Sequence, residues 1–191
     1  MLPIPIAVTL RVTSLLERLG VPYFLGGSLA STLFGAPRTT LDSDIVADLK
    51  PGQVALLVRD TEADFYVDEQ MIRDAIDHQA AFNLIHLETA FKVDVFVRSQ
   101  RPFDRAQFAR RQKRSLADQP ESQAFVASLE DTILAKLEWY RLGGEVSERQ
   151  WRDVVGVWRA CSAQLDYAYL QKWAAQLGIV DLLQPARDEA T

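Results

Sequence analysis

Cysteine is almost absent from this sequence, since Cys161 is the only one in 191 residues. A single cysteine excludes an internal disulfide framework and is typical of a protein from a reducing compartment. Long apolar runs are also missing, because none reaches the roughly 18 residues that a membrane-spanning helix needs. The apolar first residues lack a positively charged start, so we expect no signal peptide and a cytoplasmic location.

Positive charge is in the minority, with 21 Lys and Arg against 26 Asp and Glu and a net charge of −5. This balance argues against a generally basic nucleic-acid-binding protein. Residues 98–114 are the exception, because they hold seven basic residues and one acidic residue. Such a stretch contacts RNA or another polyanion in some proteins and forms a solvated helix face in others. The sequence leaves both interpretations open.

The spacing of the apolar residues predicts an α+β fold, in which a mixed α/β sheet with flanking helices precedes a C-terminal helical region. We place the α/β core at residues 1–120 and the helical region, packed on the core, at residues 121–191. The expected strands are residues 21–25, 40–49, 64–67, 81–88 and 91–97. The expected helices are residues 6–19, 28–34, 51–61, 68–77, 128–142, a segment that begins at Ser147, and 167–177. Residues 102–114 are expected to be helical in part, and the last residues to fray.

Asp42 and Asp44 stand one residue apart in a segment that alternates like a strand. Alternate side chains of a strand point to the same face, with Cα atoms roughly 6.5–7 Å apart. Leu41 and Ile45 are expected to point to the opposite face, into a core. Two carboxylates on one face repel each other unless a cation neutralises them, and Mg²⁺ takes carboxylate oxygens as ligands. The alternative is that both aspartates face water on a half-exposed strand.

Asp94 interrupts the otherwise apolar run of residues 91–97. An acid in such a run is costly to bury without a partner. If its strand lies beside the strand of Asp42 and Asp44, three carboxylates converge, as a two-metal site for phosphoryl transfer requires. The alternative is a solvated position on an edge strand, where Lys92 and Asp94 form a surface row of charges.

Gly26 and Gly27 lie between an expected strand and an expected helix, and Ser28 follows them. Glycine lets the backbone approach a ligand closely, and the first N–H groups of a helix suit an anion. Ser28 either caps the helix or donates its hydroxyl to a phosphate. Turns of this composition are common, so the motif gains its meaning from the aspartates that follow.

Lys136 lies close to the apolar stripe of its expected helix, about 55° from the mean direction of that stripe at roughly 100° per residue. A lysine in this position either extends its ammonium outward to water or meets an anion. Arg38 has a loop position from which it either neutralises a phosphate or faces solvent. Asp153 is expected to be a solvated acid on the polar face of the next helix.

Three motifs together resemble the nucleotidyltransferase superfamily, which has the polymerase-beta-like fold. They are G-G-S at residues 26–28, R-T-T-L-D-S-D-I at residues 38–45, and the lone Asp94 in a later apolar strand. With S-L-E-D-T-I-L-A-K-L at residues 128–137, they are most similar to small bacterial nucleotidyltransferases of toxin–antitoxin and abortive-infection systems.

The resemblance implies a Mg²⁺-dependent transfer of a nucleoside monophosphate from a nucleoside triphosphate to an acceptor hydroxyl. It implies two Mg²⁺ ions, with Mn²⁺ as a substitute, held by Asp42, Asp44 and Asp94. Asp94 would also help to activate the incoming hydroxyl. The residues that it assigns to nucleotide binding are Gly26, Gly27, Ser28, Arg38, Thr40 and Lys136.

The acceptor stays open between a protein side chain, a tRNA 3′ end and a small molecule such as an aminoglycoside. A cognate toxin or antitoxin is a further expected partner, and a membrane is not expected. The competing interpretation is a catalytically silent protein of the same fold that acts as an antitoxin or as a partner subunit.

Overall fold

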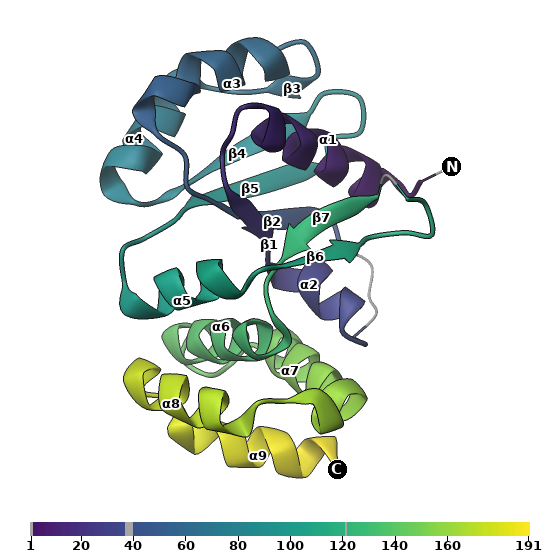
Figure 1. The fold of residues 1–191 in the computed structure, drawn as a ribbon, viewed down its shortest axis with the longest axis vertical. Coiled ribbons are helices and arrows are strands. Elements are labelled where there is room, and N and C mark those ends of the chain that lie inside the picture. Colours follow the sequence, from purple (N-terminus) through teal and green to yellow (C-terminus); the bar gives the residue numbers. More distant parts are fainter. Residues whose placement is uncertain (1, 37–39, 121) are drawn as a thin grey trace. The chain divides into compact units, whose positions relative to one another are not determined.

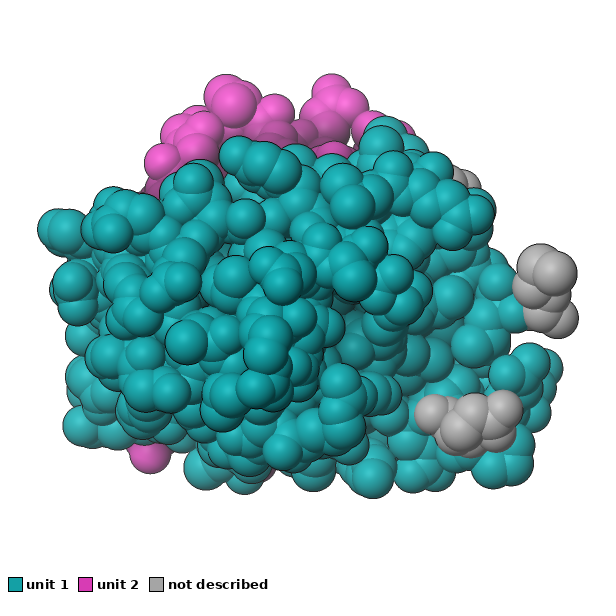
Figure 2. Space-filling model, turned by 90° about the horizontal axis from the view of Figure 1, so that it is seen from above, with its two compact units in different colours: residues 1–26, 39–126 teal, residues 27–38, 127–191 magenta. Residues whose placement is uncertain are grey.

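A computed structural model describes residues 2–36, 40–120 and 122–191 of the chain. The chain divides into two compact units, which Figure 2 distinguishes by colour. The first unit lies within residues 1–26 and 39–126, and the second lies within residues 27–38 and 127–191. The first unit is a mixed α/β structure and the second is helical, which confirms the predicted fold class.

The first unit contains a seven-stranded mixed sheet with the strand order β3-β4-β5-β2-β1-β7-β6 (Figure 1). Strand β2 runs parallel to β5, and β1 runs parallel to β7. The remaining neighbours are antiparallel. The strands are β1 (Tyr23–Leu25), β2 (Asp42–Ala47), β3 (Phe65–Tyr66), β4 (Ala81–His86), β5 (Lys92–Val97), β6 (Gln112–Ser115) and β7 (Gln123–Val126).

Burial alternates along three neighbouring strands of this sheet. In β2, β4 and β5, every second side chain is buried, and the residues between them are half-buried or exposed. Helix α1 contacts β2 and β7, helix α4 contacts β4 and β5, and helix α3 contacts both of these helices. The helices of this unit are α1 (Ile4–Arg18), η1 (Pro51–Gln53), α3 (Val54–Thr61), α4 (Glu69–His78) and α5 (Pro102–Arg110).

The second unit joins one short helix from the first part of the chain to the C-terminal helices. Helix α2 contacts α6 and α7, which explains why residues 27–36 belong to this unit although they lie between two strands of the sheet in sequence. The Ser128 side chain accepts a hydrogen bond from the Asp131 amide and so caps the start of α6. The helices are α2 (Gly27–Leu33), α6 (Leu129–Leu142), α7 (Glu148–Cys161), η2 (Ser162–Gln164), α8 (Tyr167–Leu177) and α9 (Val180–Ala190).

The structure differs from several expectations about the strands. Strands β6 and β7 were not predicted, because both have only four residues and β6 is exposed along its whole length. The hairpin between β4 and β5 is longer than expected, since β4 ends at His86 and β5 begins at Lys92. Leu41 does not point into a core: it precedes β2 and is 83% exposed.

The end of the chain is also more ordered than its composition suggests. Residues that we expected to fray form α9, which buries Leu182, Leu183 and Ala186 and contacts α7. The Arg159 guanidinium on α7 donates hydrogen bonds to carbonyl oxygens of α9. These contacts come from distant residues, so the local pattern does not reveal them. Among the described residues, no helix is both long and apolar enough to cross a membrane.

Gly35 offers a test of packing in the second unit. Its φ is +99°, and a Cβ added there would clash with the Ala160 Cβ. We expect Gly35→Ala to lower the free energy of unfolding by about 2–5 kcal/mol, because left-handed backbone strain and overpacking add up. Urea denaturation measures this loss. Gly178→Ala is the matched control, because Gly178 also has a positive φ but no atom within 4 Å of the added Cβ. Equal losses in the two variants would contradict the close contact with Ala160.

Candidate active site

Asp42, Asp44 and Asp94 lie on two neighbouring strands of the sheet. In the parallel pair of β2 and β5, Asp44 is directly opposite Asp94, and Asp42 is directly opposite Lys92. The side chains of these three aspartates and of Lys92 point to the same face of the sheet, and all four are half-buried. Neighbouring strands are about 4.8 Å apart, so the Asp44 and Asp94 carboxylates project side by side. The expectation that these two strands are neighbours is therefore confirmed.

Asp94 is not at the edge of the sheet, as one alternative supposed. Its strand β5 lies between β2 and β4, and Asn83 of β4 is directly opposite Asp94. The Asn83 amide donates a hydrogen bond to Asp94 Oδ1, and the Lys92 ammonium pairs with Asp94 Oδ2 at 2.8 Å. The Asp94 side chain is only 13% exposed, whereas that of Lys92 is 43% exposed. Both oxygens of this carboxylate thus have a polar partner.

Lys92 brings a positive charge into this group of acids. Its pKa is raised, first because the ammonium is hydrogen-bonded to Asp94 and also because of the negative charges of Asp94, Asp42 and Asp44, while partial burial acts in the opposite direction. The electrostatic field of all three carboxylates therefore reaches one ammonium group. The sequence had shown that Lys92 and Asp94 share a strand face, but Asn83 was missed because its position depends on the hairpin register.

Thr40 orients the first aspartate. Its hydroxyl is within hydrogen-bond distance of the Asp42 carbonyl oxygen, at 2.8 Å, and of Asp42 Oδ1, at 3.0 Å. Thr40 is 8% exposed, so this interaction is largely shielded from water. In this structure Thr40 thus holds the Asp42 side chain. Arg38, also expected near the nucleotide, lies outside the described residues.

The carboxylates are not arranged as a ready-made metal cage. In the described part of the chain, no group of three or more His, Cys, Asp or Glu side chains is arranged to hold a metal ion. The acids are nevertheless the hard oxygen donors that Mg²⁺ prefers. Like charges directly opposite each other across two strands are unfavourable, so a cation held by Asp44 and Asp94 would stabilise this arrangement. The donor chemistry fits a divalent metal, and Lys92 supplies positive charge in the present geometry.

The double glycine comes directly after the strand that pairs with β2. The Gly26 amide donates a hydrogen bond to the Asp44 carbonyl oxygen at 2.9 Å, which ties the turn to the aspartate strand. Gly27 then begins α2 with a φ of +54°, a conformation that glycine adopts at little cost. Ser28 is 7% exposed, and its carbonyl oxygen accepts a hydrogen bond from the Thr32 hydroxyl.

Lys136 belongs to the second unit and is buried in an ion pair. Its ammonium lies 2.7 Å from Asp153 Oδ2, both side chains are 6% exposed, and Gln150 Oε1 is 3.2 Å away. Asp153 is therefore not the solvated acid that we expected. The helical pattern placed Asp153 on a polar face, but α7 packs against α6, and this contact encloses both charges.

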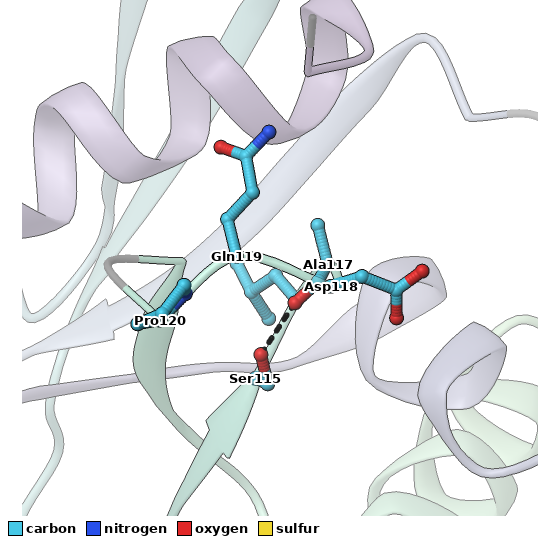
Figure 3. A pocket seen from close by; sticks show the side chains of 6 residues that line it. Ser115, Ala117, Asp118, Gln119 and Pro120 are labelled. Atoms are coloured by element: carbon cyan, nitrogen blue, oxygen red, sulfur yellow. Dashed lines mark hydrogen bonds between the residues drawn. The ribbon is translucent and has the colours of Figure 1, made fainter.

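A pocket in the first unit lies away from the aspartates, at the turn between the edge strand β6 and β7 (Figure 3). The Ser115 hydroxyl donates to the Ala117 carbonyl oxygen across this turn at 2.5 Å. Two strands, β1 and β7, separate β6 from β2 in the sheet order. The residues that line the pocket are Ser115, Leu116, Ala117, Asp118, Gln119 and Pro120. None of the predicted site residues is among them.

Comparison with solved structures finds proteins of similar fold. An antigenic nucleotidyltransferase-like protein from Paracoccidioides brasiliensis is 19% identical, with 97% of this chain and 92% of that chain covered at a TM-score of 0.59. The lincosamide antibiotic adenylyltransferase LnuA, solved with lincomycin bound, is 14% identical, with 82% and 96% covered at a TM-score of 0.51. The antibiotic-resistance factor ANT(2'')-Ia is 9% identical, with 94% and 96% covered at a TM-score of 0.51.

No family model matches this chain, and neither does any curated protein. The three structural matches cover most of this chain and most of each neighbour. At these low identities the likeness concerns the fold alone. The chain therefore has a nucleotidyltransferase-like fold.

Proposed function

We propose that this protein is a metal-dependent nucleotidyltransferase of the polymerase-beta-like superfamily, which transfers a nucleoside monophosphate from a nucleoside triphosphate to an acceptor hydroxyl. One observation carries the proposal. Asp44 and Asp94 are opposite each other on parallel neighbouring strands, with Asp42 two residues before Asp44 on the same face. The nucleotidyltransferase-like fold agrees with this reaction class.

Asp42, Asp44 and Asp94 would hold Mg²⁺, or Mn²⁺ in its place. A bound metal would neutralise triphosphate charge and stabilise the attacking and leaving oxygens. The residues of the chain act by positioning: Thr40 holds the Asp42 side chain, and Asn83 holds that of Asp94. Asp94 would also help to take up the proton of the incoming hydroxyl. Catalysis in such a site is mostly positioning and electrostatic stabilisation.

The triphosphate would bind at the glycine turn. Gly26 is tied to the aspartate strand, and Gly27 has the open backbone that a phosphate needs for close approach. Ser28 would donate its hydroxyl to a phosphate oxygen. Arg38 and Lys136 would add positive charge, and for Lys136 this requires that its ammonium give up the present pairing with Asp153.

A labelling experiment tests the activity. The protein is incubated with each radiolabelled nucleoside triphosphate, Mg²⁺ and a cell extract, and the acceptor is the fraction that takes up label. We expect transfer by the wild type and none by Asp42→Ala. If no triphosphate gives transfer and the protein binds no Mg²⁺ in a titration, the enzymatic proposal is wrong.

For the acceptor we propose RNA, such as a tRNA 3′ end. Strand β6 forms one edge of the sheet and is exposed along its length, and it carries Lys113 and Arg114. Arg105 on α5 is exposed as well. The Lys113 ammonium lies 6.0 Å from the centre of the Phe125 ring. An exposed basic edge of this kind suits a phosphate backbone.

Charge reversal tests the RNA proposal. The double variant Arg105→Glu, Lys113→Glu is expected to weaken RNA binding at least about tenfold and to lower the slope of log K against log salt by about 1 for each side chain. Fluorescence anisotropy with labelled tRNA measures both. Arg59→Glu on α3 is the control, because the Arg59 side chain is 66% exposed but lies outside the basic stretch. Equal affinities for the wild type and the double variant would favour a protein or a small molecule, such as a lincosamide-like antibiotic, as the acceptor.

A second candidate function is a catalytically silent binding protein that acts as an antitoxin or as a partner subunit. The observation in its favour is the Lys92–Asp94 ion pair, which supplies positive charge to the acids without a metal. The two candidates differ in metal binding. Transfer of label that depends on Asp42 and Asp44 excludes the silent protein, and purification of the chain with a stable protein partner but no activity would support it.

A further inference from the structure

Lys92 is at the centre of the acidic face rather than at its margin. Along β5 it shares the face of Asp94, and across the sheet it is directly opposite Asp42. Its other cross-strand neighbour is Ile85 of β4, which has no charge. The ammonium contacts Asp94 Oδ2 at 2.8 Å and also senses the charges of Asp42 and Asp44. A single side chain thus balances part of the charge of three acids.

The two partners of Asp94 differ in how easily they can leave. Asn83 is directly opposite Asp94 in the hairpin register and holds Oδ1 through its amide. Lys92 holds Oδ2 through a flexible four-carbon stem, and its side chain is 43% exposed. The Lys92 ammonium can therefore move into water without any backbone change, whereas the Asn83 amide sits on a short side chain whose backbone is held opposite Asp94 by the strand pairing.

We propose that Lys92 is an internal counter-ion of the acidic face, and that a divalent cation binds by displacing its ammonium from Asp94. The inference rests on the proposed function, because it concerns the same carboxylates. Without a metal, Lys92 reduces the repulsion between Asp44 and Asp94 and stabilises the sheet. When a metal binds, the same positive charge opposes it, so Lys92 weakens the affinity of the acids for the metal. Asn83 keeps the Asp94 carboxylate in place in both states.

Removal of the Lys92 charge separates its effect on stability without a metal from its effect on metal affinity. Lys92→Met keeps the length of the side chain and loses the ammonium. We expect it to bind Mn²⁺ about five- to tenfold more tightly than the wild type at low salt, because one positive charge near the acids is gone. In the presence of EDTA we expect its Tm to fall by about 2–4 °C, because Asp94 loses its ion pair with Lys92. Mn²⁺ binding is measured by electron paramagnetic resonance of the unbound ion, without any nucleotide.

Lys50→Met is the matched control. Like Lys92, Lys50 pairs with an aspartate two residues away in sequence, since its ammonium lies 2.7 Å from Asp48 Oδ1, and its side chain is 60% exposed. The Lys50→Met variant should bind Mn²⁺ with the affinity of the wild type. Lys92→Arg keeps the charge and should behave like the wild type.

The outcomes distinguish the inference from the proposed function. If wild-type binding is lost in Asp44→Ala but unchanged in Lys92→Met, the inference is wrong and the metal site stands. If Mn²⁺ binds neither the wild type nor Lys92→Met, the inference is wrong, and the labelling experiment decides the proposed function. Tighter binding by Lys92→Met together with lower stability in EDTA supports the displacement.

Discussion

Asp44→Asn is expected to lower the rate of nucleotide transfer by about a thousandfold or more. The substitution keeps the size of the side chain but removes the charge that faces Asp94 across the parallel strand pair. If Asp44 holds the metal as proposed, its loss removes several kcal/mol of transition-state stabilisation, and about 4 kcal/mol corresponds to a factor of a thousand. The rate is measured with saturating labelled triphosphate and the acceptor that the labelling experiment identifies.

Asp48→Asn is the control for this loss. Asp48 follows the same strand and pairs with Lys50 and Arg98, at 2.7 Å and 3.5 Å, rather than with the other acids. Its replacement should change the rate less than about tenfold, because a screened ion pair contributes little. The assignment of Asp44 is wrong if both variants lose activity equally, or if Asp44→Asn transfers at the wild-type rate while its urea denaturation matches that of the wild type.

Lys136→Ala is expected to lower the free energy of unfolding by about 3–5 kcal/mol. The Lys136 ammonium and the Asp153 carboxylate are 2.7 Å apart, and both side chains are 6% exposed. Removal of one partner leaves a buried charge without its main counter-ion, which costs far more than loss of a surface pair. Urea denaturation followed by circular dichroism measures the loss. A change below about 1 kcal/mol would show that water reaches the Asp153 carboxylate.

The double variant Lys136→Met, Asp153→Leu removes both charges and fills the space with apolar atoms. We expect it to be close to the wild type in stability, because replacement of a buried ion pair by packed apolar side chains is often neutral or stabilising. This variant also tests the nucleotide role of Lys136, since it removes the ammonium from a folded protein. Triphosphate affinity that falls about tenfold or more would assign Lys136 to nucleotide binding. Unchanged affinity would leave it a structural residue.

The elements with strong local patterns were predicted well. Strands β2, β4 and β5 and helices α1, α6 and α7 have clear apolar spacing, and the caps at Ser128 and Ser147 are visible in the sequence. The short exposed strand β6 and the terminal helix α9 were missed. Their existence depends on partners far away in the chain, β7 for the strand and α7 for the helix. Local spacing contains no information about such partners.

By itself, the sequence determined which acids share a strand face, because strand periodicity alone places Asp42 with Asp44 and Lys92 with Asp94. It also indicated the reaction class through its motifs. Only the tertiary structure decided that β2 and β5 are parallel neighbours, which sets Asp44 opposite Asp94. It also decided that Asn83 holds Asp94 and that Lys136 is buried with Asp153. Pairing and burial result from long-range contacts, in which the hydrophobic core fixes the register and the register fixes which charges meet.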